Sequence, residues 1–135
     1  MLWKAMTPRV HGDIVVIDLA GKVGLGDDAE LISYVVTLLE QGFLRFVLNF
    51  VEVPYVDSMT LGETIQAFST VGRRGGRLVL LHVHSRVRAV LDKEGLSRLI
   101  QVFDSEEDAV RGFGDVPAGS ATIQPHAWRN PRARR

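Results

Sequence analysis

The sequence predicts an α/β fold: a mixed, mostly parallel sheet of about four to five strands with about four helices. Three observations predict it. Short runs of Val, Ile, Leu and Phe alternate along the chain with segments whose apolar residues recur at helical spacing. The connections between them are short and carry Gly, Pro or Asp. Strands that alternate with helices through short loops favour parallel pairing with right-handed crossovers.

The first strands are expected before residue 24. Residues 13–23 open with the β-branched run Ile14–Ile17, and Gly12 and Gly21 bound the run, which is typical of a buried strand. The sequence around Val10 predicts a short strand before it, with "HGD" as the turn. This first strand can therefore pair antiparallel at the edge of the sheet.

Residues 24–42 predict the first helix. Asp27 or Asp28 can serve as its N-cap, and Gly42 stands where a glycine commonly follows a helix. Apolar residues recur between these ends at helical spacing, namely Leu31, Ile32, Val35, Leu38 and Leu39.

The middle of the chain predicts two strands and a helix. Residues 43–53 are almost continuously apolar up to Pro54, which indicates a central strand covered on both faces. Residues 60–76 have one apolar side and end in Gly75–Gly76, which predicts a helix. Residues 77–83 predict another buried strand.

The last elements are shorter. Residues 85–95 predict a helix with Ser85 as its cap and Gly95 as its stop, residues 99–103 a short strand, and residues 104–113 a helix with an acidic first turn. The composition then changes to Pro, Gly, Ala, Ser and Arg without periodicity. We therefore expect one domain over residues 1–113 and a flexible, basic tail over residues 114–135.

Composition narrows the function classes. The chain has 135 residues, of which 46% are hydrophobic and 24% charged, as in ordinary globular proteins. The 16 basic and 16 acidic residues balance, so no global charge favours specific nucleic-acid binding. The absence of cysteine excludes disulfides, thiolate nucleophiles and cysteine metal sites. Neither a signal peptide nor a long apolar span is evident, so a cytoplasmic protein is expected.

Catalytic signatures are lacking in the sequence. There is no P-loop, "GKVGLGDD" lacks the Rossmann spacing, and Ser58 has no nucleophile-elbow frame. His82 and His84 have a spacing that can chelate a metal, but no third ligand is evident. We therefore predict a protein that is not an enzyme and has no cofactor or metal. A ligand binder or hydrolase using Ser58 is a remaining hypothesis, because ligand sites lie beyond strand ends.

Two basic stretches allow alternative interpretations. Arg73, Arg74 and Arg77 in "VGRRGGR" lie at an expected helix end, where cations are favoured, so they either cap the helix or form a phosphate-binding patch. The end of the tail, "HAWRNPRARR", is either a solvated terminus or a nonspecific contact for acidic partners or phosphates.

The stretch "YVDSMTLGET" lies where a strand gives way to a helix. Asp57 and Ser58 are ordinary N-cap residues, and Thr60 with Glu63 can form a capping box. The same geometry suits a modification site, because backbone N–H groups at a helix N-terminus stabilise a phosphate. A phosphate on Ser58 would also repel Asp57 and expel a partner fitted to the unmodified surface.

These residues, and the order of elements over residues 10–112, resemble the STAS domain family, in particular its bacterial anti-sigma-factor antagonists. The family pattern pairs a strand reading V-L-[DN]-hydrophobic with a later D-S-[ST]-G-L-G. Here it appears as Val47–Phe50 followed by Asp57–Gly62. Met59 and Thr60 stand where the family has a hydroxyl residue and a glycine, and Gly24 stands where it has an acidic or hydroxyl residue.

The resemblance implies a protein-interaction switch. Ser58 would be phosphorylated by an anti-sigma factor with a histidine-kinase-like ATPase fold, which binds the unphosphorylated antagonist. Asp57 would position the site, and Leu61–Gly62 would let the helix pack closely. The partner-binding residues implied are Asp57, Ser58, Met59, Thr60, Leu61, Gly62 and Gly24. The alternative is a scaffold of the same fold that is never phosphorylated, in a signalling or transporter-associated complex. A homodimer is left open.

Overall fold

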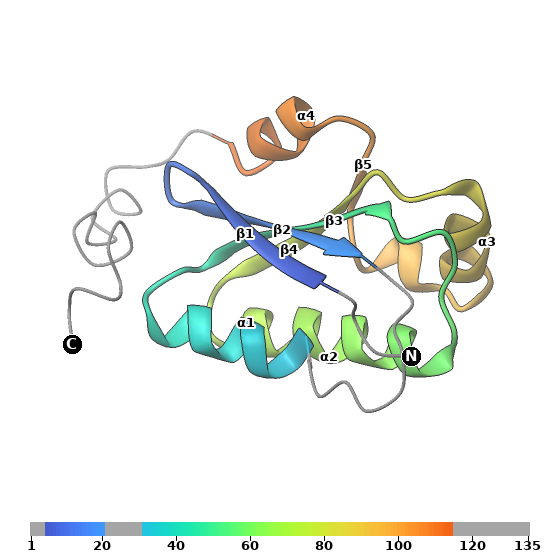
Figure 1. Cartoon of the computed structure of the whole chain (residues 1–135), viewed down its shortest axis with the longest axis horizontal. Helices are drawn as coiled ribbons and strands as arrows, with labels where there is room; N and C mark the ends of the chain where they lie inside the picture. The colour runs from blue at the N-terminus through green and yellow to red at the C-terminus, as the bar shows by residue number, and fades with distance from the viewer. Residues whose placement is uncertain (1–4, 21–30, 115–135) are drawn as a thin grey trace.

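The structure is a computed structural model of the chain, and it describes residues 5–20 and 31–114. Five strands form one sheet in the order β1-β2-β3-β4-β5 (Figure 1). The strands are β1 (Ala5–His11), β2 (Ile14–Ala20), β3 (Arg45–Glu52), β4 (Arg77–Leu81) and β5 (Val102–Phe103). The helices are α1 (Leu31–Glu40), α2 (Ser58–Arg73), α3 (Ser85–Lys93) and α4 (Glu106–Arg111), with a 3₁₀ turn, η1 (Leu96–Arg98).

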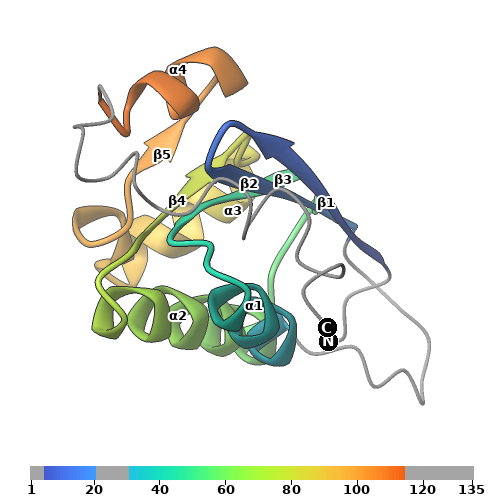
Figure 2. The same ribbon diagram turned by 90° about the vertical axis from the view of Figure 1, so that its left-hand side faces the viewer.

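The strand pairing confirms the predicted fold class. β1 pairs antiparallel with β2, and the pairs from β2 to β5 are all parallel. From β2 onward the order advances in one direction, so right-handed crossovers place their helices on one face of the sheet. α1, α2 and α3 share that face and its hydrophobic core, whereas α4 lies on the opposite face (Figure 2).

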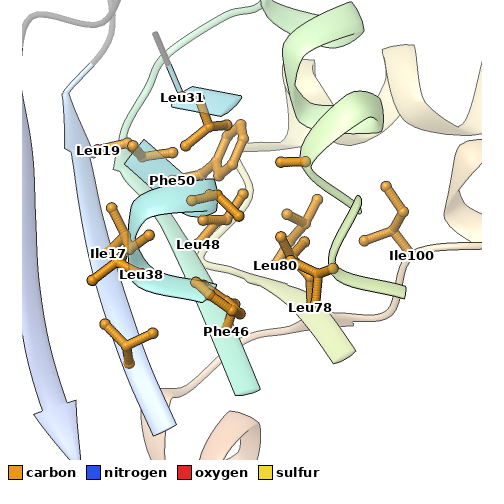
Figure 3. Packing of buried hydrophobic residues seen from close by; sticks show 14 of the residues in the cluster. Ile17, Leu19, Leu31, Leu38, Phe46, Leu48, Phe50, Leu78, Leu80 and Ile100 are labelled. Atoms are coloured by element: carbon orange, nitrogen blue, oxygen red, sulfur yellow. The ribbon is translucent and has the colours of Figure 1, made fainter. Parts of the chain in front are cut away.

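The main core lies between the sheet and the first three helices (Figure 3). Strand alternation explains its composition, because Phe46, Leu48 and Phe50 of β3 point into this core. Val47 points to the other face, into a smaller cluster that α4 covers. Both faces of β3 are therefore buried, which confirms residues 43–53 as a central strand and explains their continuous apolarity.

Several local predictions need correction. His84, and not Ser85, is the N-cap residue of α3, and it makes no side-chain capping bond. The last strand is shorter than predicted, because η1 occupies the preceding turn and Ile100 turns into the main core. Gly42 and Gly95 end α1 and α3 at positive φ, as predicted. The proposed caps of α1, Asp27 and Asp28, lie outside the described residues.

The described residues include no helix that is long and apolar enough to cross a membrane. The basic tail is outside the described residues as well, so its role stays a prediction.

One arginine ties the edge of the sheet to α4. The guanidinium of Arg9, on β1, donates to the Asp18 carboxylate of β2 at 2.5 and 2.9 Å and to the Glu106 carboxylate of α4 at 2.9 and 3.0 Å. Asn49 adds a bond from Nδ2 to Asp18 at 2.8 Å, and His11 Nε2 lies 3.0 Å from Glu106. The charge and hydrogen bonds of Arg9 lower the pKa of both carboxyl groups.

Replacing Arg9 by alanine is expected to cost about 1–2 kcal/mol of stability at pH 7, because the network is only partly buried. The folded-state pKa values of Asp18 and Glu106 are lowered, so the stabilisation is complete above their unfolded values of about 4 and is lost as pH falls through the folded values. Urea unfolding from pH 7 to pH 3 should show the difference between wild type and Arg9→Ala shrinking below about pH 4.

Arg88→Ala is the matched control, because Arg88 pairs at 4.0 Å with a highly exposed Asp104. It should change the free energy of unfolding by only a few tenths of a kcal/mol, on the order of an exposed ion pair. An Arg9→Ala difference that stays constant down to pH 3 would contradict the assignment to ionised Asp18 and Glu106.

Candidate functional site

The predicted site lies at the connection from β3 to α2. Asp57 is the N-cap of α2 in extended conformation, and its Oδ1 accepts a hydrogen bond from the backbone N–H of Thr60 at 2.8 Å. The Asp57 carbonyl also accepts from Leu61 N at 2.9 Å. The Thr60 N–H bond lowers the pKa of Asp57, because it stabilises the ionised carboxylate. The predicted capping role of Asp57 is confirmed.

Ser58 is the first residue of α2 and is exposed. The N-terminus of a helix carries partial positive charge and backbone N–H groups without intrahelical acceptors. An anion on the Ser58 hydroxyl would therefore lie in a favourable local field, next to the negative Asp57 carboxylate.

The two residues after Ser58 that depart from the family pattern differ in exposure. Met59 is 58% exposed, whereas Thr60 is fully buried at 0%. Among the described residues Thr60 Oγ1 has no hydrogen-bond partner, although the Thr60 carbonyl accepts from Thr64 Oγ1 at 2.9 Å. The added bulk of Thr60 is thus accommodated inside the domain, and Met59 alone changes the surface beside Ser58.

Two expectations about α2 are wrong. Gly62 is exposed, and a Cβ at its position would meet no atom within 4 Å, so the glycine is not needed for packing within this domain. Thr60 and Glu63 form no capping box, because Thr60 bonds to Asp57. Glu63 Oε1 instead accepts from Leu31 N at 2.9 Å, at the described start of α1. Leu61 is half-buried against the main core. Gly24 lies outside the described residues.

Sequence reasoning missed two residues of this surface, Val51 and Tyr55. The described part of the chain exposes five large apolar side chains, and three of them, Val51, Tyr55 and Met59, lie within nine consecutive positions around Ser58. Such clustering marks interaction surfaces. The signal was the apolar sequence on either side of Pro54, which continues beyond the end of β3.

Buried polar groups fix the end of β3 that leads to the site. Asn49 is 7% exposed, its Nδ2 donates to Asp18, and its Oδ1 accepts from Val51 N at 3.1 Å. His84 Nε2 lies 2.8 Å from the Val51 carbonyl oxygen. These contacts anchor the last residues of β3 to β2 and to the start of α3, so the loop toward Ser58 starts from a fixed point.

His82 and His84 do not lie on a strand, although residues 77–83 were predicted as one. β4 ends at Leu81, His82 adopts a positive φ of 56°, and His84 is the N-cap of α3. Within residues 5–20 and 31–114, no three His, Cys, Asp or Glu side chains gather in a way that could hold a metal ion.

Asp57→Ala is expected to destabilise the domain by about 1 kcal/mol, because the Thr60 N–H loses its acceptor. Asp57→Asn should retain most of that stability, since Asn caps helices about as well as Asp. Thermal and urea unfolding of the two variants measures the difference. Equal losses in both variants would show that the charge of Asp57, and not its capping bond, is what stabilises.

A model of the STAS domain family matches residues 5–109. The chain belongs to the STAS domain family. The anti-sigma-B factor antagonist of Bacillus subtilis is 31% identical over 96 residues, which cover 70% of this chain and 86% of that protein. The anti-sigma F factor antagonist of Paenibacillus polymyxa is 22% identical over 105 residues, covering 74% and 86%.

Solved structures show the same STAS fold. An anti-sigma factor antagonist from Mycobacterium paratuberculosis superposes with a TM-score of 0.70 at 14% identity, covering 82% of this chain and 94% of that one. The Bacillus cell-fate determinant SpoIIAA in its phosphorylated form superposes with a TM-score of 0.64 at 23% identity, covering 81% and 99%. This STAS domain therefore resembles anti-sigma factor antagonists at low identity.

Proposed function

We propose that this STAS domain is an anti-sigma-factor antagonist-like switch in the cytoplasm. It binds an anti-sigma factor with a histidine-kinase-like ATPase fold through the surface around Ser58, and phosphorylation of Ser58 ends that binding. The observation that carries the proposal is the exposed Ser58 at the first position of α2, directly after the capping Asp57. The kinase would supply the catalysis, and this chain supplies the acceptor hydroxyl and the binding surface.

The local electrostatics support a reversible switch. A phosphate adds a charge of about −2 near neutral pH, and the N-terminus of α2 favours that charge. The adjacent carboxylate of Asp57, whose pKa is already lowered, stays ionised beside it. The unmodified Ser58 presents a neutral hydroxyl in a stretch of chain that also exposes Val51, Tyr55 and Met59, which suits a partly apolar partner. The modified surface would be strongly anionic.

The test is incubation with the candidate kinase and ATP, followed by mass spectrometry of the intact chain and its peptides. One phosphate is expected on wild type and none on Ser58→Ala. Ser85→Ala is the matched control, because Ser85 is also an exposed serine at the first position of a helix. Phosphate that persists in Ser58→Ala would show that another residue is the acceptor.

Met59 favours a second candidate, the scaffold that is never phosphorylated. An exposed thioether stands where the family pattern has a hydroxyl residue, so the surface beside Ser58 is more apolar than that pattern implies. A scaffold would bind its partner equally well as wild type and as Ser58→Asp. A switch would lose binding in Ser58→Asp.

A further inference from the structure

A groove lies between the C-terminal end of α2 and the β4–β5 edge of the sheet. Its volume is about 230 Å³. It is lined by Phe68, Gly72, Gly76, Arg77, Leu78, Leu99 and Gln101. α2 has 16 residues and is therefore about 24 Å long, so the groove and Ser58 lie at opposite ends of this helix. A protein bound at Ser58 would leave the groove accessible or reach it with a separate segment.

One arginine lines the groove, and three more are close to lining residues in the chain. Arg77 is part of the lining, Arg73 and Arg74 directly follow Gly72, and Arg98 directly precedes Leu99. Within the described residues none of these four guanidinium groups has a carboxylate partner. Arg73 donates to Thr70 Oγ1, and Arg77 donates to the Gly112 carbonyl at 2.7 Å and to Gln101 Oε1. These acceptors are neutral, and the Arg77 guanidinium also lies over the Phe113 ring, 5.2 Å from its centroid. Among the described residues no carboxylate therefore offsets the charge of these arginines.

The floor of the groove is apolar and open. Leu99 is 64% exposed, and Phe68 is half-buried. Gly72 leaves space beside them, because a Cβ built there would meet no atom within 4 Å. Helix capping explains why Arg73 and Arg74 stand at the end of α2 and Arg98 in the last turn of η1, and Arg77 contacts Gly112, Gln101 and the Phe113 ring. None of these contacts explains the exposure of Leu99.

We propose that this groove is a second docking site, for an acidic segment of a partner protein that inserts one apolar side chain beside Leu99. Charge complementarity selects the acidic occupant, since the lining contains no acid. It also disfavours the basic tail of this chain as the occupant. Single-stranded nucleic acid is less suited, because Phe68 is the sole aromatic residue of the lining and is half-buried, whereas such strands need exposed stacking platforms.

The test uses the full ¹⁵N-labelled chain and a short acetylated peptide of Asp and Glu with one central Leu. Amide shifts are expected at Gly72, Gly76, Leu99 and Gln101 and not at Ser58. Arg73→Gln/Arg74→Gln should weaken binding about tenfold, as should replacing the peptide Leu by Ser. Arg86→Gln is the control, since Arg86 is an exposed arginine of α3 outside the groove.

A second variant blocks the groove without removing an arginine. Gly72→Glu places an acidic side chain in the open space and should abolish the shifts, whereas Gly72→Ala should only weaken them. Retained peptide binding in Gly72→Glu would overturn the proposal, as would shifts centred on Ser58. An oligonucleotide that shifts the groove amides at lower concentration than the peptide would also overturn it. No kinase is involved, so the outcome is independent of the Ser58 proposal.

Discussion

Gly76→Ala is expected to destabilise the domain by about 3 kcal/mol, at the upper end of the cost of overpacking. A Cβ on Gly76 would overlap the backbone carbonyl oxygen of Leu44 and crowd a methyl group of Val71. The Leu44 carbonyl cannot retreat easily, because it accepts a hydrogen bond from Arg77 N at 2.8 Å in the β3–β4 ladder. Urea unfolding monitored by circular dichroism measures the loss.

Gly72→Ala is the matched control, four residues earlier in the same glycine-rich stretch. A Cβ at Gly72 meets no atom within 4 Å, and the residue lies in α2, where alanine is favoured by up to about 1 kcal/mol. We therefore expect one glycine-to-alanine change to destabilise and the other to be neutral or stabilising. A Gly76→Ala protein as stable as wild type would show that β3 and β4 can separate slightly at no cost.

Ser58→Glu is expected to weaken binding of the anti-sigma factor partner at least about 100-fold, a change of roughly 2.7 kcal/mol. The glutamate adds a second charge next to Asp57 and the exposed, apolar Met59, and burying it unpaired in an interface is costly. Isothermal titration with the purified kinase measures the change. Phosphorylated wild type should bind more weakly still, because phosphate carries about twice the charge.

The control for this experiment is Ser85→Glu, which adds the same charge at the first position of α3. Its effect should be several times smaller if the interface centres on Ser58. Ser58→Glu should keep its stability, because acids are favoured in the first turn of a helix. Comparable losses from Ser58→Glu and Ser85→Glu would place the interface between α2 and α3 and argue against Ser58 as its centre.

Features that depend on near neighbours were predictable from the sequence. Asp57 could be predicted as a cap because its carboxylate and the backbone N–H that donates to it, on Thr60, are only three residues apart. The end of α2 followed from Gly75, which adopts a positive φ of 84°. The need for Gly76 could not be predicted in this way, because Leu44, which directly precedes β3, is distant from it in the sequence. The prediction that Glu63 forms a capping box was wrong for the same reason, because its partner, Leu31, belongs to another helix.

In the candidate site, too, the features that depend on near neighbours in sequence could be predicted and the others could not. Ser58 could be predicted, because a strand, a cap and a helix in sequence place it at the surface. The exposure of Val51 could not be predicted, because it depends on where the elements that cover β3 end. The sequence does not show which of Met59 and Thr60 faces outward, and the structure shows that Thr60 is buried and Met59 is exposed.

The two faces of the sheet are covered unequally, and we expect this to decide where the domain opens locally. Three helices close the main core, whereas α4, a helix of six residues, is the only described element over the other face. Such a small unit has few contacts to break, so it should open locally without global unfolding. Amide hydrogen exchange should therefore be fastest along α4 and β1, which Arg9 joins, and slowest in β3. Local opening would then occur at α4 and β1, whereas α2, which begins at Ser58 and packs on the main core, would stay closed.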